Sequence, residues 1–234
     1  MKHIFKTMAF LLTTVLFVGC QKITTDGVTQ ITYYPVFTLT GGSTLTVPVG
    51  QTFTDPGVIC MEGENDITGK VKVSGSVNTN QLGVYQLTYS AINVDGFAGS
   101  ATRTVVVYNP AITTDISGAY TVAAGTNRTT LSSGAKTAYS GYPVNITLMA
   151  PGVFYVSDFF GGYYDKRAAY GSSYAMTGYI SLNEDNSIDL ISSHVSGWGD
   201  GLTELDNASY DPDSGIQWSA VYVANYSFNV ILTK

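Results

Sequence analysis

The sequence predicts an all-β protein with two consecutive antiparallel domains and almost no helix. Charged residues make up only 12% of the 234 residues, aromatic residues make up another 12%, and glycine occurs 25 times. A low charge fraction combined with many Tyr, Thr, Val and Gly residues is typical of β-structure. Several segments alternate apolar and polar residues. Beyond the N-terminal segment, none carries a sustained apolar stripe with the period of a helix.

The first 19 residues resemble a bacterial lipoprotein signal peptide. Lys2 and Lys6 supply a positive start, and the apolar run MAFLLTTVLFVG that follows is too short for a confident membrane span. The run ends directly before Cys20, and Phe17 stands where such signals usually carry Leu. The resemblance implies that cleavage leaves Cys20 as a lipidated N-terminus. The alternative is an ordinary secretory signal followed by a chance cysteine.

Residues 20–30 show no strong period, and we expect them to form a tether. Acyl chains on Cys20 would hold the protein on the outer membrane, more plausibly at the cell surface than on the periplasmic face. The other cysteine, Cys60, then has no disulfide partner, and its apolar surroundings predict a buried free thiol.

The first domain is expected over residues 31–109. In the segment GVYQLTYSAINV, which begins at residue 83, Tyr85, Leu87 and Tyr89 fall on one face of a strand and polar residues fall on the other. Asp95-Gly96 is a hairpin signal, and the apolar run TRTVVVY returns as the last strand.

The order of three motifs in this region resembles a bacterial immunoglobulin-like domain of the kind repeated in surface proteins. The motifs are TFTDPGV at 52–58, DIT at 66–68 and the strand pair at 83–107. The resemblance implies a β-sandwich that serves as a spacer or adhesion module without catalysis. The sequence lacks the cysteine pair of antibody domains, so we expect its core to hold by apolar packing alone.

A linker is predicted at 108–115, because Pro110 cannot continue a central strand. The second domain, residues 113–234, is expected to be an up-and-down barrel or a sandwich. Its eight predicted strands are 118–124, 142–150, 153–158, 174–182, 187–193, 205–210, 216–222 and 227–233.

The connections between these strands alternate between short and long. The short ones have turn chemistry and comprise 151–152, 183–186 and 211–215. The long ones are 125–141, 159–173 and 194–204. Alternate connections of a meander lie at the same end, so the long loops should gather at one mouth, where ligands of a rigid β-scaffold usually bind.

The long loops carry the residues that a sugar site needs, namely flat aromatic faces and planar polar groups. The stretch DFFGGYYDKRAAYG begins at Asp158, and Gly161 and Gly162 would let its backbone approach a ligand. Phe159 and Phe160 could stack on a ligand or could close the barrel as core. Tyr163, Tyr164 and Trp198 could likewise stack on a ligand or belong to the core. The predicted ligand-binding residues are Tyr163, Tyr164, Asp165, Arg167, Tyr170, Trp198 and Asp200.

Trp218 alternates with Ile216 and Ala220 in a predicted strand, so we expect it in the core.

The formal net charge of −6 argues against a general nucleic-acid binder, which needs a basic surface to displace counterions. Metal signals are weak. Asp211 and Asp213 lie in a loop without the EF-hand spacing, and a solvated turn explains them. No metal or other cofactor is expected.

Catalysis also has little support. His194 is the only histidine beyond the predicted signal peptide. Asp158 could pair with Asp165 or Asp200 as the two carboxylates that a glycosidase needs, but no motif distinguishes these acids from others in loops. We therefore expect a protein without enzymatic activity.

The second domain resembles the C-terminal domain of Bacteroidetes surface lipoproteins that lack an assigned function. The motifs that carry this resemblance are APGVFYVSDFFGGYY, YAMTGYISL, SGWGDG, SYDPDSGIQWSA and FNVILTK. Such lipoproteins are commonly encoded beside glycan-uptake systems of the starch-utilisation type. The resemblance implies a non-enzymatic role in the cell envelope. Our expectation is a glycan-binding accessory that works with outer-membrane uptake proteins on a polysaccharide or oligosaccharide. The alternative is a structural or protein-interaction module without a sugar ligand.

Overall fold

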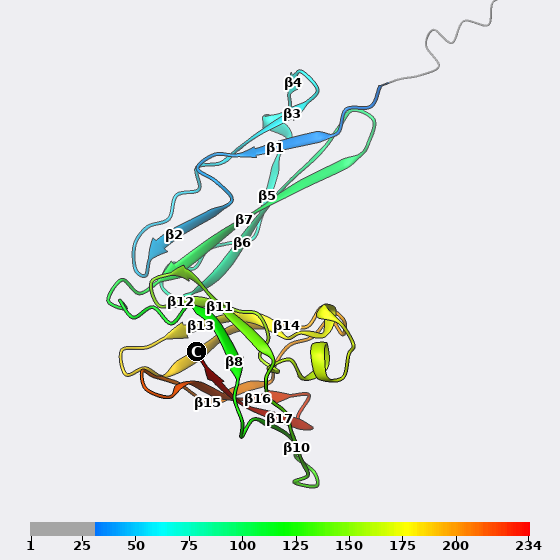
Figure 1. Cartoon of the computed structure of the whole chain (residues 1–234). Helices are drawn as coiled ribbons and strands as arrows, with labels where there is room; N and C mark the ends of the chain where they lie inside the picture. Colours follow the sequence, from blue (N-terminus) through cyan, green and yellow to red (C-terminus); the bar gives the residue numbers. More distant parts are fainter. Residues whose placement is uncertain (1–30) are drawn as a thin grey trace, which may run out of the picture. The chain divides into compact units, whose positions relative to one another are not determined.

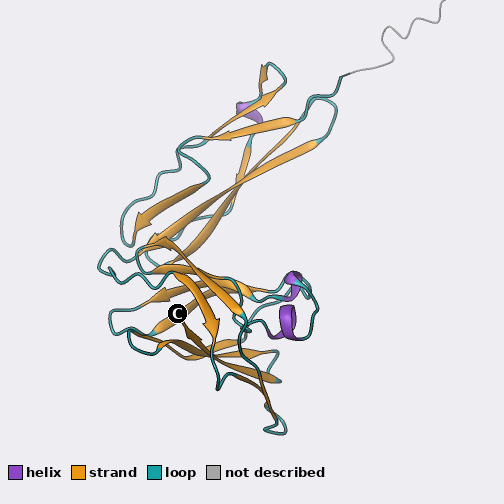
Figure 2. Ribbon diagram, viewed as in Figure 1, coloured by secondary structure: helices purple, strands orange, loops and turns teal. Residues whose placement is uncertain are grey.

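The computed structural model describes residues 31–234, in which the regular secondary structure is almost entirely β-strand (Figures 1 and 2). The predicted signal peptide, Cys20 and the tether lie outside the described residues. None of the helices in residues 31–234 has the length and hydrophobicity needed to span a bilayer. The few helices are single turns, η2 (Thr68–Lys70), η3 (Tyr163–Arg167) and η4 (Ser172–Tyr174).

The first domain is a sandwich of two sheets, as the motifs predicted. One sheet has the order β1-β3-β4 and the other has the order β2-β7-β6-β5, with β2 parallel to β7. The strands are β1 (Pro35–Leu39), β2 (Thr44–Pro48), β3 (Val58–Glu62), β4 (Asn65–Asp66), β5 (Lys72–Ser74), β6 (Gly83–Ile92) and β7 (Ala98–Tyr108).

The alternation in β6 places its apolar residues in the core, as predicted. Leu87 and Tyr89 are buried with Val105 and Val107 of β7, and the Asp95-Gly96 turn joins the two strands. Cys60 is a free thiol with no exposed surface, and its burial raises its pKa. The predicted buried free thiol is therefore confirmed.

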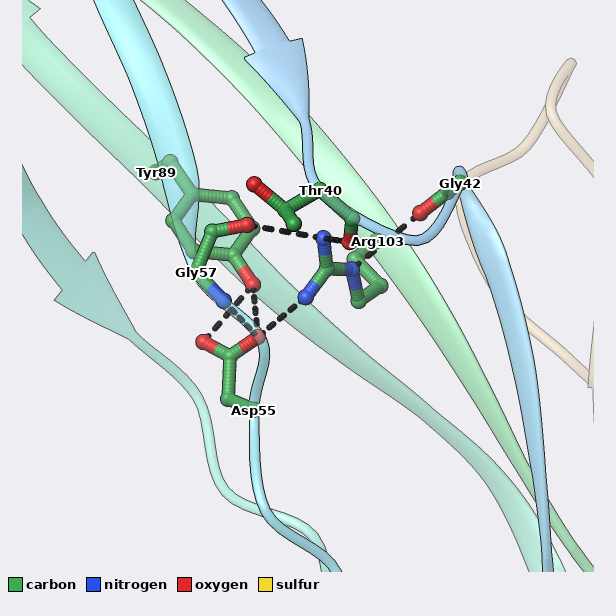
Figure 3. A network of polar contacts seen from close by, with 6 residues as sticks. All are labelled: Thr40, Gly42, Asp55, Gly57, Tyr89 and Arg103. Carbon is green, nitrogen blue, oxygen red and sulfur yellow. Dashed lines mark hydrogen bonds and ion pairs between the residues drawn. The ribbon is translucent and has the colours of Figure 1, made fainter.

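The expectation that this core holds by apolar packing alone is wrong, because a buried polar network crosses the sandwich (Figure 3). Arg103 has no exposed surface and forms an ion pair with Asp55. Its guanidinium also donates to the backbone carbonyls of Thr40 (2.6 Å), Gly57 (2.9 Å) and Gly42 (3.3 Å).

Asp55 joins this network to the core and is the aspartate of the TFTDPGV motif. Its carboxylate accepts from the hydroxyl of Tyr89 at 2.8 Å and from the backbone N–H of Gly57 at 3.1 Å. The Arg103 guanidinium lies 5.4 Å from the centre of the Tyr89 ring. The motif therefore supplies the counter-charge without which a buried arginine would be costly.

The second domain is a single antiparallel sheet, coloured green to red in Figure 1. Its ten strands are β8 (Gly118–Val122), β9 (Asn127–Thr130), β10 (Lys136–Ala138), β11 (Pro143–Ala150), β12 (Val153–Val156), β13 (Thr177–Leu182), β14 (Ile188–His194), β15 (Glu204–Asp211), β16 (Gly215–Tyr222) and β17 (Tyr226–Thr233).

Eight of these strands are the predicted ones, and they follow one another as a meander. Strand β8 pairs with β11, and the chain then continues through β12 and β13 to β14. Strands β15, β16 and β17 form the other half. The pairing of β17 with β8 joins the two halves of the sheet. Strands β14 and β15 approach at a single bridge between Ser187 and Ser209, so the barrel is incompletely closed.

The hairpin β9–β10 lies within the long connection 125–141, where no strand was predicted. Strand β9 pairs with β17 in the register Arg128 to Phe228. This pairing turns the predicted loop into an extension of the sheet and fixes Arg128 at a defined position.

Trp218 is 2% exposed, which confirms the prediction that it belongs to the core. Its ring lies against Phe159 with centroids 5.5 Å apart, and its indole N–H donates to the carbonyl of Phe159 at 2.9 Å. The core of the barrel is thus tied to the start of the connection 159–173.

Candidate functional site: the loop mouth

The three long connections meet at one end of the barrel, as the meander predicted. Tyr139 of the first connection contacts Tyr163 of the second, with ring centroids 5.1 Å apart. Tyr164 contacts Trp198 of the third at 4.8 Å. We call the connections 125–141, 159–173 and 194–204 together the loop mouth.

Asp158 fixes the central loop of the mouth. This carboxylate is 5% exposed and accepts from the backbone N–H groups of Phe160 (2.9 Å), Gly162 (2.8 Å) and Met176 (3.0 Å). It therefore ties both ends of the loop together and satisfies three backbone donors that burial would otherwise leave unpaired.

Gly161 and Gly162 were expected to let the backbone approach a ligand, but in the structure they make room for neighbouring core side chains. Gly161 and Gly162 both have positive φ, at 59° and 78°. A Cβ atom at Gly162 would lie 2.6 Å from the Cβ of Tyr142. The close approach that these glycines allow is to core side chains, so a larger residue at 162 would displace the loop.

The aromatic residues on both sides of these glycines are mostly core. Phe159 and Phe160 have no exposed surface, which selects the barrel-closing alternative for both. Tyr163 and Tyr164 are only 6% and 8% exposed, so neither offers a free ring face for stacking. Their expected role as sugar platforms is not supported. Instead, they form the floor of the mouth.

Two of the predicted aromatic residues remain open to solvent. Trp198 is 41% exposed and Tyr170 is 56% exposed. Buried or partly buried rings support both, because Trp198 stacks on Tyr222 (5.7 Å, planes at 26°) and Tyr170 stacks on Tyr164 (5.8 Å, 30°). The two exposed rings lie 6.4 Å apart at 81° to each other and form an angled surface.

The predicted polar residues lie around these rings. Asp200 accepts from the hydroxyl of Tyr222 at 2.9 and 3.0 Å, which positions the ring beneath Trp198. Asp165 pairs with Lys166 at 3.0 Å. Arg167 is exposed and lies 5.2 Å from the centre of the Tyr163 ring.

Sequence reasoning missed Arg128 as a component of the mouth. Its guanidinium lies between two rings, 4.8 Å from the centre of Tyr163 and 4.6 Å from that of Tyr226. The burial of Tyr164 raises its pKa, and its interaction with Arg128 partly opposes that effect. The sequence predicts a loop where the structure has the hairpin that carries Arg128, and no motif distinguishes this arginine.

The opposite end of the barrel carries a groove with a volume of about 440 Å³, lined by the short turns at 183–186 and 211–215. Asp211 in this groove accepts from the backbone N–H groups of Asp213 and Ser214, both at 2.9 Å. This is the arrangement of an ordinary turn. Within residues 31–234, no group of three or more acidic, histidine or cysteine side chains is placed to hold a metal ion.

The carboxylate pairs considered for glycoside hydrolysis both contain Asp158. That group is buried under the loop and already accepts three backbone hydrogen bonds, so it cannot reach a sugar in this structure. Neither of these pairs therefore offers a sugar two accessible carboxylates.

The environment of Asp158 predicts a pH dependence of stability. Burial raises the pKa of Asp158 to about 7, against the effect of its three N–H donors. Because the pKa in the unfolded chain is about 3.9, the folded state binds the proton more tightly. The resulting stabilisation is present below about pH 4 and is lost as the pH rises through about 7.

Asp158→Asn removes this titration. The difference in free energy of unfolding between the wild type and this variant should therefore shrink as the pH rises from about 4 to 8. Urea unfolding followed by tryptophan fluorescence at several pH values measures it. A difference that grows with pH would show that the native state favours the carboxylate.

Comparison with known proteins identifies both domains. Residues 37–107 match the family model of the bacterial surface protein Ig-like domain, and residues 109–234 match a family model described as a C-terminal domain. No curated protein matches the chain.

Among solved structures, the lipoprotein BT2262 from Bacteroides thetaiotaomicron is 41% identical, with 86% of this chain and 100% of that chain covered and a TM-score of 0.49. Two structures of Clostridium perfringens ZmpB also match. One contains CBM51-2 in complex with GlcNAc and INT domains (15% identity, 52% and 28% covered, TM-score 0.28). The other contains the M60 catalytic domain with CBM51-1 and CBM51-2 (14% identity, 53% and 14% covered, TM-score 0.29).

Both ZmpB matches are too distant to bear on function. The identity with BT2262 extends over most of both chains, and the protein described here therefore belongs to the same family as that bacterial lipoprotein.

Proposed function

We propose that the second domain binds a glycan at the loop mouth without catalysis. The observation that carries this proposal is the exposure of Trp198 and Tyr170 on an otherwise buried aromatic cluster. Large exposed rings that rigid neighbours support lose little conformational freedom on binding, and their apolar faces suit the C–H side of a sugar ring.

The geometry favours a short angled contact over a long flat one. Because the two exposed rings are inclined by 81°, they would stack on two differently oriented faces of one or two sugar units. Arg167 and Asp200 are both exposed near this surface and would hydrogen bond to hydroxyl groups. Tyr163 and Tyr164 support the site from below.

The predicted lipidation of Cys20 and the membership in a lipoprotein family support an envelope location for this activity. We further propose that the protein is anchored on the outer membrane, at the cell surface, and holds polysaccharide for an uptake system. The immunoglobulin-like domain would then act as a spacer between the lipid anchor and the binding domain.

The test is a binding screen of the unlipidated chain, residues 21–234, against plant, host and microbial polysaccharides by retardation in affinity gels. A hit should weaken by about twofold to tenfold in Trp198→Ala, since an aromatic contact contributes on the order of 0.5–1.5 kcal/mol. Tyr222→Phe, which keeps the ring beneath Trp198 and removes the bond to Asp200, should bind more weakly by a smaller factor. Binding that Trp198→Ala leaves unchanged would move the site away from the mouth.

One observation favours a protein-interaction role as the second candidate. Val36 of β1 and Ile59 of β3 lie on the outer face of their sheet in the first domain and are 63% and 50% exposed. Exposed apolar side chains on neighbouring strands are a common feature of docking surfaces. If no polysaccharide of a broad panel is retained, this surface becomes the leading candidate for function.

A further inference from the structure

The arginines of this chain are few and unevenly placed. There are three, Arg103, Arg128 and Arg167. Arg103 is fully buried and belongs to the polar network of the first domain. The other two come from distant parts of the sequence and meet around one ring of the loop mouth, that of Tyr163, at 4.8 and 5.2 Å.

Neither of these two arginines has an acidic partner. Among the described residues, the ion pairs are Arg103 with Asp55 and Lys166 with Asp165, so no carboxylate lies within 4 Å of Arg128 or Arg167. The nearby Asp158 directs both oxygens to backbone N–H groups. Two guanidinium groups without a carboxylate partner, in a chain of net charge −6, call for a separate explanation.

Arg128 also retains an unused donor. Its Nε is buried and has no hydrogen-bond partner, and it is the only such side-chain atom found within residues 31–234. Leaving a buried donor of a charged group unpaired is costly. Because this Nε is closed to solvent, an acceptor from a ligand would meet the other nitrogens of the guanidinium. The planar guanidinium, held between Tyr163 and Tyr226, is oriented in advance for such an acceptor.

The aromatic surface and the arginine pair adjoin through two buried tyrosines. The ring of Tyr163, which carries both guanidinium groups, contacts that of Tyr164 at 5.1 Å. Tyr164 in turn contacts both exposed rings, Trp198 at 4.8 Å and Tyr170 at 5.8 Å. The two arginines therefore lie two ring contacts away from each of the exposed rings.

We propose that Arg128 and Arg167 bind an oxyanion substituent of the glycan, so that the loop mouth takes an acidic polysaccharide in preference to a neutral one. The inference rests on the proposed function and adds the chemical class of its ligand. A uronic acid carboxylate and a sulfate ester offer the same paired oxygens to a guanidinium, and both accept charge-assisted hydrogen bonds from arginine.

The experiment compares charged polysaccharides with neutral counterparts of related backbone in affinity gels. Polygalacturonate and its fully methyl-esterified form test the carboxylate, and carrageenan and agarose test the sulfate. Chondroitin sulfate, compared with its desulfated and methyl-esterified form, tests both on one backbone. The expected result is retention by at least one charged member and not by its counterpart, with retention that weakens as salt is added.

Variants separate the two proposals. Arg167→Met should weaken binding of the charged glycan at least about tenfold, as the loss of a charge-assisted bond predicts. Lys166→Met is the matched control, because it removes the same charge from the neighbouring residue, which is already paired with Asp165, and should change binding less than about twofold. Arg128→Lys keeps the charge but loses the planar fork, and an intermediate effect is expected.

Each outcome has a definite meaning. Retention of neutral glycans that depends on Trp198 but not on the arginines would overturn the acidic ligand and leave the glycan site standing. Retention of charged glycans that depends on the arginines but not on Trp198 would uphold the oxyanion site and overturn the aromatic one. Retention of no glycan at all would overturn both.

Discussion

Arg103→Met should destabilise the immunoglobulin-like domain by about 3 kcal/mol or more. The substitution keeps much of the side-chain volume but removes the partner of Asp55 and the donor to three backbone carbonyls. Removing one member of a buried ion pair is strongly destabilising because the remaining charge and acceptors stay desolvated. Asp55 is partly exposed, with 26% of its side chain in contact with solvent, which limits the loss.

Unfolding of the two domains can be followed separately. Both tryptophans of the chain, Trp198 and Trp218, belong to the second domain. Tryptophan fluorescence therefore follows that domain, while far-UV circular dichroism follows both. Arg103→Met should lower the midpoint of unfolding that circular dichroism detects by more than the midpoint that fluorescence detects. Lys72→Met, on an exposed strand, is the control and should change stability by less than about 0.5 kcal/mol. A stability of Arg103→Met equal to that of the control would contradict a structural role for the network.

Asp158→Ala should cost the second domain on the order of 3–5 kcal/mol, because three backbone N–H groups lose their acceptor at once. Domains of this size are commonly stable by only about 5–15 kcal/mol, so this loss is a large fraction of the total stability. Asp158→Asn keeps one acceptor oxygen and should lie between the wild type and the alanine variant. Urea unfolding followed by tryptophan fluorescence gives these values.

The matched control for this prediction is Asp165→Ala in the same loop. Asp165 forms an ion pair with the half-exposed Lys166, and pairs of this kind contribute at most about 1 kcal/mol. If Asp158→Ala were no more destabilising than Asp165→Ala, the loop would not depend on the buried carboxylate. The mouth would then lack the rigid base that the binding proposal requires.

Sequence patterns predicted the strands of the second domain because each strand carries its own alternation. The segment 227–233, for example, places Phe228, Val230 and Leu232 on one face, and all three are buried in β17. The gathering of the long loops followed from their order alone. The hairpin β9–β10 was missed because its residues are polar, and it is ordered by pairing with β17 and not by a pattern of its own.

Exposure of the loop aromatics could not be predicted because it depends on tertiary packing. Tyr164 and Tyr170 are both tyrosines of one loop, yet one is 8% exposed and the other 56%. The difference arises from the contacts of Tyr164 with Phe160 and Phe228, and Phe228 is distant in sequence. The same limit applies to Arg103 and Arg128, whose partners are brought together only by the sheet.

The two indole N–H groups offer the most direct test of the glycan site. Trp198 lies at the mouth with 41% of its surface exposed, whereas Trp218 is 2% exposed and donates its N–H to the carbonyl of Phe159. Nuclear magnetic resonance of the ¹⁵N-labelled chain, with the two signals assigned by Trp198→Phe, resolves both. Titration with neutral and acidic oligosaccharides should shift the Trp198 signal and leave that of Trp218 in place. An unmoved Trp198 signal at saturating concentrations of a retained glycan would contradict a binding site at the loop mouth.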